Sequence, residues 1–355
     1  MTDSVLSILK TAVERGASDL IVVAGLPVSC KINGSVERMG DSPLMPEDTQ
    51  RLADEVYAEA GRTKEIYNAH GDDDFSLTIK GLSRFRVAVF RQRGSCSMVV
   101  RVVAFSLPDP TALGIPDGVM RFAEETKGLV LVTGPAGSGK STTLACLIDR
   151  INSTRPAHII TIEDPIEFLH RHKVGIVSQR EIASDTESYE AALRGALRQA
   201  PDVILLGEMR DLETIRAAMT AAETGHLVLS TLHTLGAAST VDRIVDIFPP
   251  AQQAQIRVQL SMVLRGVISQ QLIAKADGSG AVPAFEIMHA TSAVRNLIRE
   301  AKTHQIDAVI STSAADGMRA MDAELAALVR SGVITAEAAM THALIPDQLK
   351  RRLNA

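Results

Sequence analysis

A glycine-rich segment that follows an apolar run limits most strongly what this chain can fold into. Residues 129–132 are continuously apolar, as in a strand that is buried on both faces of a parallel sheet. Residues 134–142 then read Gly-Pro-Ala-Gly-Ser-Gly-Lys-Ser-Thr, which contains the spacing Gly-x-x-x-x-Gly-Lys-Ser. This pattern predicts a strand, a loop that surrounds phosphate groups with backbone N–H donors, and a helix whose N-terminus faces the same anion. We therefore predict a P-loop that binds ATP and Mg²⁺, rather than a glycine-rich turn that only joins a strand to a helix.

The residues expected to bind the nucleotide come from this loop and from the first turn of the helix. Lys140 can reach the β- and γ-phosphates, and the Ser141 hydroxyl can bind Mg²⁺. The full predicted set is Gly134, Pro135, Ala136, Gly137, Ser138, Gly139, Lys140, Ser141 and Thr142.

Two further apolar runs end in carboxylates. Residues 202–206 lead through Gly207 to Glu208, which is the Walker B pattern, and residues 159–162 lead to Glu163. A carboxylate near the γ-phosphate can orient the attacking water or hold the shell of Mg²⁺. We predict that Glu163 and Glu208 are catalytic and, with Ser141, bind Mg²⁺ directly or through water. The alternative, a solvated acid at a strand end, has more weight for Glu163 than for Glu208.

Two histidines flank the apolar run 227–231. His226 precedes it and His233 follows it, so both are candidates for reporting the state of the nucleotide. A single histidine in such a place is more often a hydrogen-bonded structural residue. Metal binding is disfavoured for this pair, because no cysteine or third histidine shares the spacing.

Composition and charge narrow the class of protein. The 355 residues are enough for about two domains, and the net charge of −5 gives no general attraction to polyanions. The lack of tryptophan and the three tyrosines leave few stacking surfaces for nucleic acid, so no nucleic-acid partner is expected. The three widely spaced cysteines favour reduced thiols and a cytoplasmic location. No signal peptide or transmembrane segment is predicted.

The first part of the chain, residues 1–104, is predicted to be an α+β domain. Ser4 is a candidate N-cap for the first helix, and Asn33-Gly34 is a candidate hairpin turn. Helices are expected after Ser4, over 46–60 and up to about His70. Strands are expected over 20–23, 28–32, 35–39, 74–79, 84–90 and 97–103.

Residues 105–116 are rich in Pro and Gly and are predicted to be a linker, followed by a second domain over 117–355. Strands and helices alternate in this domain, which predicts an α/β sheet with the nucleotide at the carboxyl ends of its strands. The region from about 250 to 355 is predicted to be mostly helical. The expected strands are 129–133, 158–163, 175–179, 202–206 and 227–231, and the expected helices are 142–152, 188–198 and 211–223.

The motifs of residues 128–249 together resemble those of the bacterial type II/IV secretion ATPase family. The resemblance is carried by the P-loop, an acidic box at 161–167, Walker B at 202–211 and a histidine box at 223–234. Residues 207–216, 292–300 and 317–322 are similar to the pilus-retraction branch of that family. The resemblance covers nearly the whole chain, and it implies a PAS-like first domain and a RecA-like P-loop ATPase second domain. Ile21 and Val294 depart from the family pattern, which has His and Ile there, but neither touches the phosphate chemistry.

The resemblance implies a homohexameric ring that hydrolyses ATP to drive type IV pilus retraction and twitching motility. Its implied partners are the pilus machinery and an inner-membrane platform protein, which would hold the cytoplasmic ring peripherally at that membrane. A pilus-assembly or type II/IV secretion motor is the first alternative. Those motors commonly carry an extra N-terminal domain and a zinc-binding cysteine pair, and neither is present in this sequence. A nucleic-acid motor is the second alternative. A regulatory protein that binds a nucleotide without hydrolysing it is the third, but such a protein would be expected to lack a catalytic acid, and Glu163 and Glu208 are both present.

Two arginines of the first domain are further candidates. A strand over 84–90 puts Arg84 and Arg86 on the face opposite Phe85, Val87 and Val89. Paired guanidiniums suit the charge of a phosphoryl-transfer transition state. In a ring they could act on the ATP of a neighbouring subunit, with Arg91 and Arg93 near enough to share the role. The alternative is a solvated basic strand face.

Residues 292–300 are predicted to form an amphipathic helix. Val294, Leu297 and Ile298 should pack inward, and the resemblance implies a role in retraction rather than in hydrolysis. The alternative is an ordinary surface helix. The side chains expected to stand clear are Arg295, Asn296, Arg299 and Glu300.

Overall fold

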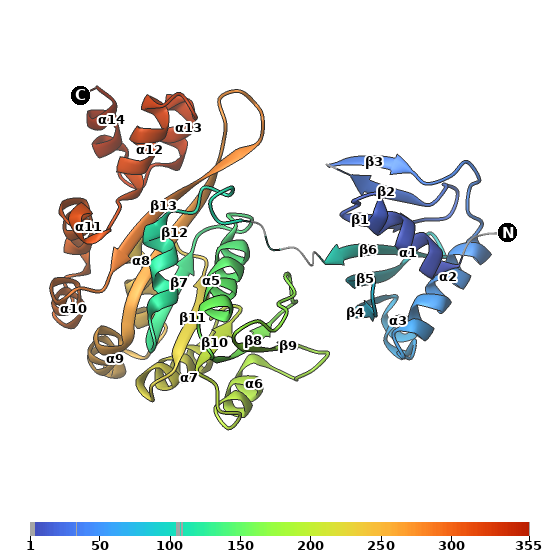
Figure 1. Cartoon of the computed structure of the whole chain (residues 1–355), viewed down its shortest axis with the longest axis horizontal. Helices are drawn as coiled ribbons and strands as arrows, with labels where there is room; N and C mark the ends of the chain where they lie inside the picture. The colour runs from blue at the N-terminus through green and yellow to red at the C-terminus, as the bar shows by residue number, and fades with distance from the viewer. Residues whose placement is uncertain (1–3, 33, 104–106, 108, 355) are drawn as a thin grey trace. The chain divides into compact units, whose positions relative to one another are not determined.

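The computed structural model describes residues 4–32, 34–103, 107 and 109–354, which form two compact units (Figure 1). The first unit comprises Met1–Ser106 and Glu167–Leu169, and the second comprises Leu107–Ile166 and His170–Ala355. Asn33 of the predicted hairpin turn and residues 105, 106 and 108 of the predicted linker lie outside the described residues. Each unit contains one sheet with helices packed on it, so the predicted mixture of α and β structure is confirmed.

The first unit is built on a six-stranded antiparallel sheet with the order β3-β2-β1-β6-β5-β4. Apolar side chains of the helices and of the sheet share one core, which includes Leu9, Leu52 and Val100. Ser4 caps the first helix, because its hydroxyl accepts the N–H of Ser7 at 3.4 Å. The elements are α1 (Val5–Glu14), β1 (Asp19–Val22), β2 (Ser29–Ile32), β3 (Ser35–Arg38), α2 (Pro46–Glu59), α3 (Glu65–His70), β4 (Asp72–Ile79), β5 (Ser83–Gln92) and β6 (Ser95–Val103).

Strand β5 has the two faces that its sequence predicts. Phe85, Val87 and Val89 are buried, whereas Arg86 is exposed and Arg84 is half-buried. Arg84 Nη1 donates to the Thr78 hydroxyl at 3.4 Å. The two arginines therefore lie on the face that points away from the core of this unit.

The second unit is built on a seven-stranded sheet with the order β13-β12-β7-β11-β10-β8-β9. Neighbouring strands are parallel except for the antiparallel pair β12 and β13. The strands are β7 (Gly128–Thr133), β8 (His158–Glu163), β9 (Ile176–Glu181), β10 (Val203–Leu206), β11 (Leu227–Leu232), β12 (Leu264–Ala274) and β13 (Ala281–His289).

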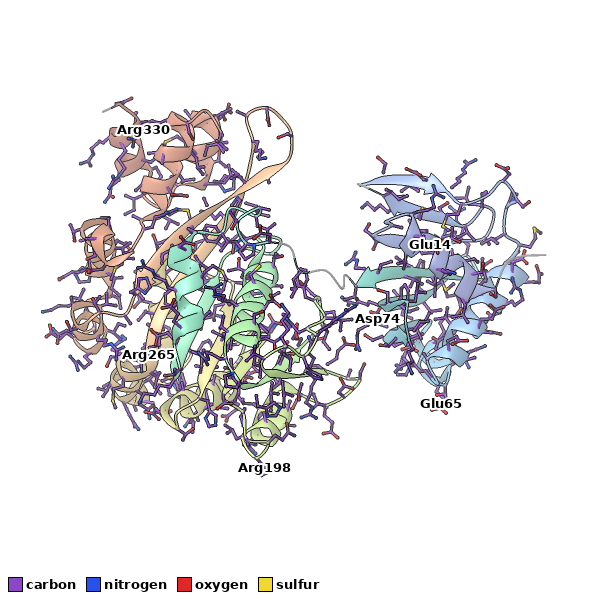
Figure 2. All side chains as sticks on the ribbon, in the orientation of Figure 1. Glu14, Glu65, Asp74, Arg198, Arg265 and Arg330 are labelled. Atoms are coloured by element: carbon purple, nitrogen blue, oxygen red, sulfur yellow. The ribbon has the colours of Figure 1, made fainter. Side chains whose placement is uncertain are left out.

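Helices cover both faces of this sheet, which explains why β7 is apolar without alternation. Leu129 and Leu131 face one core, and Val130 and Val132 face the other. Charged side chains such as Arg198 and Arg330 point outward (Figure 2). The helices are α4 (Asp117–Met120), η1 (Arg121–Glu124), α5 (Lys140–Thr154), α6 (Tyr189–Ala196), α7 (Leu212–Glu223), α8 (Ala237–Asp246), α9 (Pro250–Val263), α10 (Ser292–Arg299), η2 (Thr303–Gln305), α11 (Ile306–Thr312), η3 (Ala314–Asp316), α12 (Met321–Arg330), α13 (Ala336–His342) and α14 (Pro346–Asn354).

The prediction of a mostly helical region from about 250 onward is wrong for the hairpin β12–β13. This hairpin extends the sheet beside β7, and only the segments before and after it are helical. Both faces of β12 are buried over most of its length, so the alternation that marks a half-exposed strand is missing. Three polar residues, 269–271, also interrupt its apolar run.

Helix α10 packs as predicted except for one side chain. Val294 and Ile298 are buried, and Arg299 and Glu300 are exposed. Arg295 does not stand clear, because its guanidinium donates to three backbone carbonyls, two at the end of α9 and one just before α10. The acceptors are the oxygens of Ala290 at 2.8 Å, Met262 at 3.1 Å and Leu264 at 3.3 Å. The last carbonyls of a helix lack partners within that helix, which explains why an arginine is held there. Burial lowers the pKa of Arg295.

Glu286 of β13 joins two helices of the second unit. Its carboxylate, 4% exposed as a residue, accepts the N–H of Ala237 at 2.8 Å and that of Met321 at 3.3 Å. These residues begin α8 and α12, so one acid caps both helices. Burial raises the pKa of Glu286 to about 7, and nearby Asp307 and Asp322 act in the same direction.

We expect this acid to make folding stability depend on pH. The unfolded chain loses the proton near pH 4.5, whereas the folded chain keeps it until about pH 7. The contribution of Glu286 to the free energy of unfolding is therefore present at low pH, and it falls by roughly 2 to 3 kcal/mol as the pH rises from 5 to 8. Glu286→Gln keeps an acceptor without the charge and should lack this loss. Denaturant unfolding of both proteins at pH 5, 6, 7 and 8 measures the difference, and parallel curves would contradict it.

Candidate functional site

The loop between β7 and α5 has the shape that binds phosphate groups. Gly134 begins it at φ +143°, and Gly139 ends it at φ +89° as the N-cap of α5. A Cβ on Gly134 would lie 2.1 Å from the backbone oxygen of Gln270, so only glycine fits there. Ser138 Oγ is buried in the loop and has no hydrogen-bond partner among the described residues. A glycine cradle, an unpartnered hydroxyl and a helix N-terminus together fit the phosphates of a nucleotide.

Lys140 bends back over this loop. It is 8% exposed, and its Nζ donates to the carbonyl oxygens of Gly134 at 2.9 Å and Pro135 at 2.8 Å. Ser141 and Thr142 follow it in the first turn of α5 and are half-buried. The ammonium thus lies where the loop closes, beside the expected position of the phosphates.

Glu208 lies at the same edge of the sheet as the P-loop. Strands β7, β11, β10 and β8 are parallel neighbours, so their carboxyl ends meet at one edge. The Glu208 side chain is 12% exposed, with one oxygen 2.6 Å from Arg210 Nη2 and the other 3.4 Å from His233 Nε2. The structure therefore brings Glu208 and His233 together, because they follow the adjacent strands β10 and β11.

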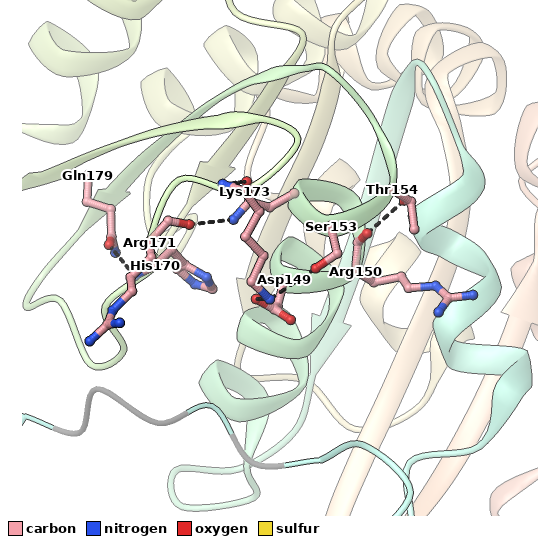
Figure 3. Close-up of polar contacts among 9 residues, drawn as sticks. Asp149, Arg150, Ser153, Thr154, His170, Arg171, Lys173 and Gln179 are labelled. Carbon is pink, nitrogen blue, oxygen red and sulfur yellow. Dashed lines mark hydrogen bonds and ion pairs between the residues drawn. The ribbon is translucent and has the colours of Figure 1, made fainter.

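Glu163 ends β8 and is held by two donors. The Thr161 hydroxyl donates to its carboxylate at 2.6 Å, and Gln179 Nε2 donates at 3.3 Å. The other end of the Gln179 amide accepts the N–H of His170 at 2.8 Å, so one side chain joins the acid to the loop that follows it (Figure 3). Burial lowers the pKa of His170 to about 4, which keeps this ring neutral at physiological pH.

The same loop is fastened to the second half of α5 (Figure 3). Asn152 Nδ2 donates to the carbonyl of Arg171 at 2.7 Å, and Lys173 Nζ reaches Asp149 at 2.6 Å and Ser153 at 3.0 Å. The helix that begins at the P-loop therefore also fixes the segment next to Glu163.

Tyr189 and Arg210 were not predicted for the site. A cavity of about 550 Å³ beside Glu208 is lined by both, together with Asp164. Burial and the charges of Asp164, Glu208 and Glu163 raise the pKa of Tyr189, so its hydroxyl stays neutral. Arg210 could have been found from its place two residues after Glu208, but Tyr189 has no signal in the sequence.

His226 lies far from the P-loop of its own chain, so the prediction that it belongs to that nucleotide site is wrong. His226 precedes β11 and so lies at the amino edge of the sheet, opposite the P-loop. Its Nδ1 contacts the Ala221 carbonyl at 3.0 Å and the Thr224 hydroxyl at 3.2 Å. It is a hydrogen-bonded residue at the end of α7, which is the structural alternative given above.

Arg84 and Arg86 belong to the first unit, and their role in catalysis stays a prediction. The described residues contain no group of three or more His, Cys, Asp or Glu that could hold a metal ion. A P-loop does not need such a group, since a hydroxyl and the phosphates supply ligands to Mg²⁺. Ser141 lies in the first turn of α5, Glu163 ends β8, and Glu208 lies two residues after the neighbouring strand β10 at the same edge. Binding of Mg²⁺ by these three residues stays a prediction.

The model of a family described as "Type II/IV secretion system protein" matches residues 3–308. The chain belongs to this family. It is 46% identical over 343 residues to the type IV pilus retraction ATPase PilT of Pseudomonas aeruginosa, which covers 97% of this chain and 99% of that protein. It is 46% identical over 340 residues to a twitching motility protein of Neisseria gonorrhoeae, which covers 96% of this chain and 90% of that protein.

The similarity in sequence is matched by a similarity in three-dimensional structure. The crystal structure of the pilus retraction motor PilT with bound ADP has a TM-score of 0.91 and 47% identity, and covers 99% of this chain and 100% of that one. None of the helices that the structure describes in this family member has the length and apolar character needed to cross a bilayer.

We expect Glu208→Gln and Glu163→Gln each to keep ADP affinity while ATP turnover falls by about 10²-fold or more. The amide keeps the shape but loses the charge that orients water. The Kd for ADP and the rate of ATP turnover should be measured for the parent protein and for each variant. Asp246→Asn, an exposed acid at the end of α8, is the control and should change neither. Weakened binding with normal turnover would contradict a catalytic role.

Proposed function

We propose that this chain is an ATP-hydrolysing motor that powers type IV pilus retraction and hence twitching motility. The observation that carries the proposal is the edge of the second sheet, where the P-loop, Glu163 and Glu208 meet. The similarity to PilT over 99% of the chain supports assigning this edge to a retraction motor.

The chemistry follows from the side chains at this edge. Lys140 would exchange the Gly134 and Pro135 carbonyls for phosphate oxygens and so bring its positive charge to the β- and γ-phosphates. Glu208, held between Arg210 and His233, would orient the attacking water, while Glu163 would act from the neighbouring strand. Mg²⁺, when bound by Ser141, would supply positive charge to the phosphates. Comparing the turnover of the two Gln variants measures how much each carboxylate contributes to hydrolysis.

The assembly that we propose is a homohexameric ring with ATP at its subunit interfaces. The first unit would be a PAS-like domain and the second a RecA-like ATPase domain. Residues 105–116 would link them and let one rotate against the other. The ring would work in the cytoplasm, held at the inner membrane by a platform protein of the pilus machinery. The supports are the family motifs and the names of the relatives.

Deletion of the gene from its bacterium tests the direction of the motor. Loss of a retraction motor should leave excess surface pili and no twitching, and the parent gene should restore motility. Lys140→Ala should fail to restore it, because the loop then lacks its mobile cation, while Asp246→Asn should succeed. Surface pili are counted by electron microscopy and motility by colony spreading. A deletion strain without pili would indicate the alternative, an assembly motor.

A mixing experiment tests whether the arginines act between subunits. Arg84→Ala/Arg86→Ala rings and Lys140→Ala rings should each lack ATPase activity. Rings assembled from both should regain part of it, because some interfaces pair an intact P-loop with intact arginines. Arg38→Ala, an exposed arginine of the same unit, is the control and should stay active. Full activity of the double-arginine variant, or mixed rings as inactive as either parent, would overturn the role.

A further inference from the structure

Gln270 of β12 lies beneath the P-loop although it is 130 residues away from it in the sequence. The preceding residue, Ser269, pairs with Thr133 of β7, so Gln270 is level with the start of the loop. It is polar yet only 4% exposed. Its side-chain oxygen accepts the hydroxyl of Thr143 at 2.7 Å, and Thr143 is fully buried in the first turn of α5.

The same residue touches both ends of the loop. A Cβ on Gly134 would lie 2.1 Å from the backbone oxygen of Gln270, and a Cβ on Gly139 would lie 2.8 Å from its side-chain nitrogen. The backbones of Gly134 and Gly139 therefore both lie directly against Gln270. Together with Thr143, these contacts give Gln270 three points of attachment around the loop.

We propose that Gln270 is a positioning residue for the phosphate loop. By holding Gly134, Gly139 and the first turn of α5 against β12, it fixes where Lys140 and the backbone N–H groups point. This inference rests on the proposed function, since it assumes that the loop binds a nucleotide. Removing a buried hydrogen bond loosens the loop before binding, and part of the ordering must then occur when the nucleotide binds.

The next residue of β12 offers a matched control. Gln271 is also 4% exposed, but it points to the other side of the strand and bonds α13. Its Nε2 donates to the His342 carbonyl at 2.9 Å, and its Oε1 lies 2.9 Å from His342 Nδ1. Gln271→Ala therefore removes an equally buried amide from the same strand without touching the P-loop.

The experiment measures ADP affinity by calorimetry and the KM and kcat for ATP on the full chain. Gln270→Ala and Thr143→Val should each raise the Kd for ADP and the KM for ATP about tenfold, with kcat changed less than about threefold. The double variant should be no worse than Gln270→Ala alone, because Thr143→Val removes a bond that Gln270→Ala has already removed. Thr143→Ser keeps the hydroxyl and should bind ADP within about twofold of the parent.

The outcomes separate this inference from the proposed function. A parent chain that does not bind ADP would sink the proposed function itself. A parent that binds ADP, with Gln270→Ala binding equally well, would overturn only the positioning role. Equal weakening by Gln271→Ala, or additive losses in the double variant, would also overturn it. If Gln270→Ala fails to fold, the pair Thr143→Val and Thr143→Ser still decides, because only the first lacks the hydroxyl.

Discussion

The parallel pairing of β7, β11, β10 and β8 is the constraint on which the candidate site depends. It brings together at one edge segments that are separated by up to 100 residues in the chain. Each strand is buried on both faces, so its position cannot shift without repacking two cores. The P-loop, Glu163, Glu208 and His233 are thus positioned by strands that are packed on both faces. Glu163 is the last residue of β8, the P-loop and His233 directly follow β7 and β11, and Glu208 lies two residues after β10.

Much of this arrangement could be predicted because the sequence of parallel strands carries a strong signal. A run such as 203–206 is apolar throughout and is followed two residues later by the carboxylate of Glu208, and the P-loop motif shows where β7 ends. The same signal fails when a buried strand contains polar residues. β12 carries Ser269, Gln270 and Gln271, so the sequence does not distinguish the hairpin that it forms from the helical segments around it.

The remaining errors concern single side chains whose surroundings are set by the tertiary structure and not by the local sequence. A residue just before a strand and a residue just after it look equally close to a site in sequence, but they lie at opposite edges of the sheet. This explains why His233 lies at the edge of the P-loop, beside Glu208, whereas His226 lies at the opposite edge. Similarly, the spacing of α10 shows which face is apolar, but it cannot show that Arg295 reaches the Met262 and Leu264 carbonyls at the end of α9. Gln179 and Tyr189 depend on tertiary contacts and have no local signal.

Strand β13 forms one edge of the second sheet, and an edge strand can template pairing with another chain. Part of this edge is covered by a short segment from far along the chain. Ile287 and Arg319 exchange both backbone hydrogen bonds, with N–O distances of 2.8 Å and 2.9 Å. A ribosome must therefore complete the chain to beyond residue 319 before this edge can be closed. Until then the nascent protein presents an open β-edge on this side of the sheet, where another chain could pair with β13.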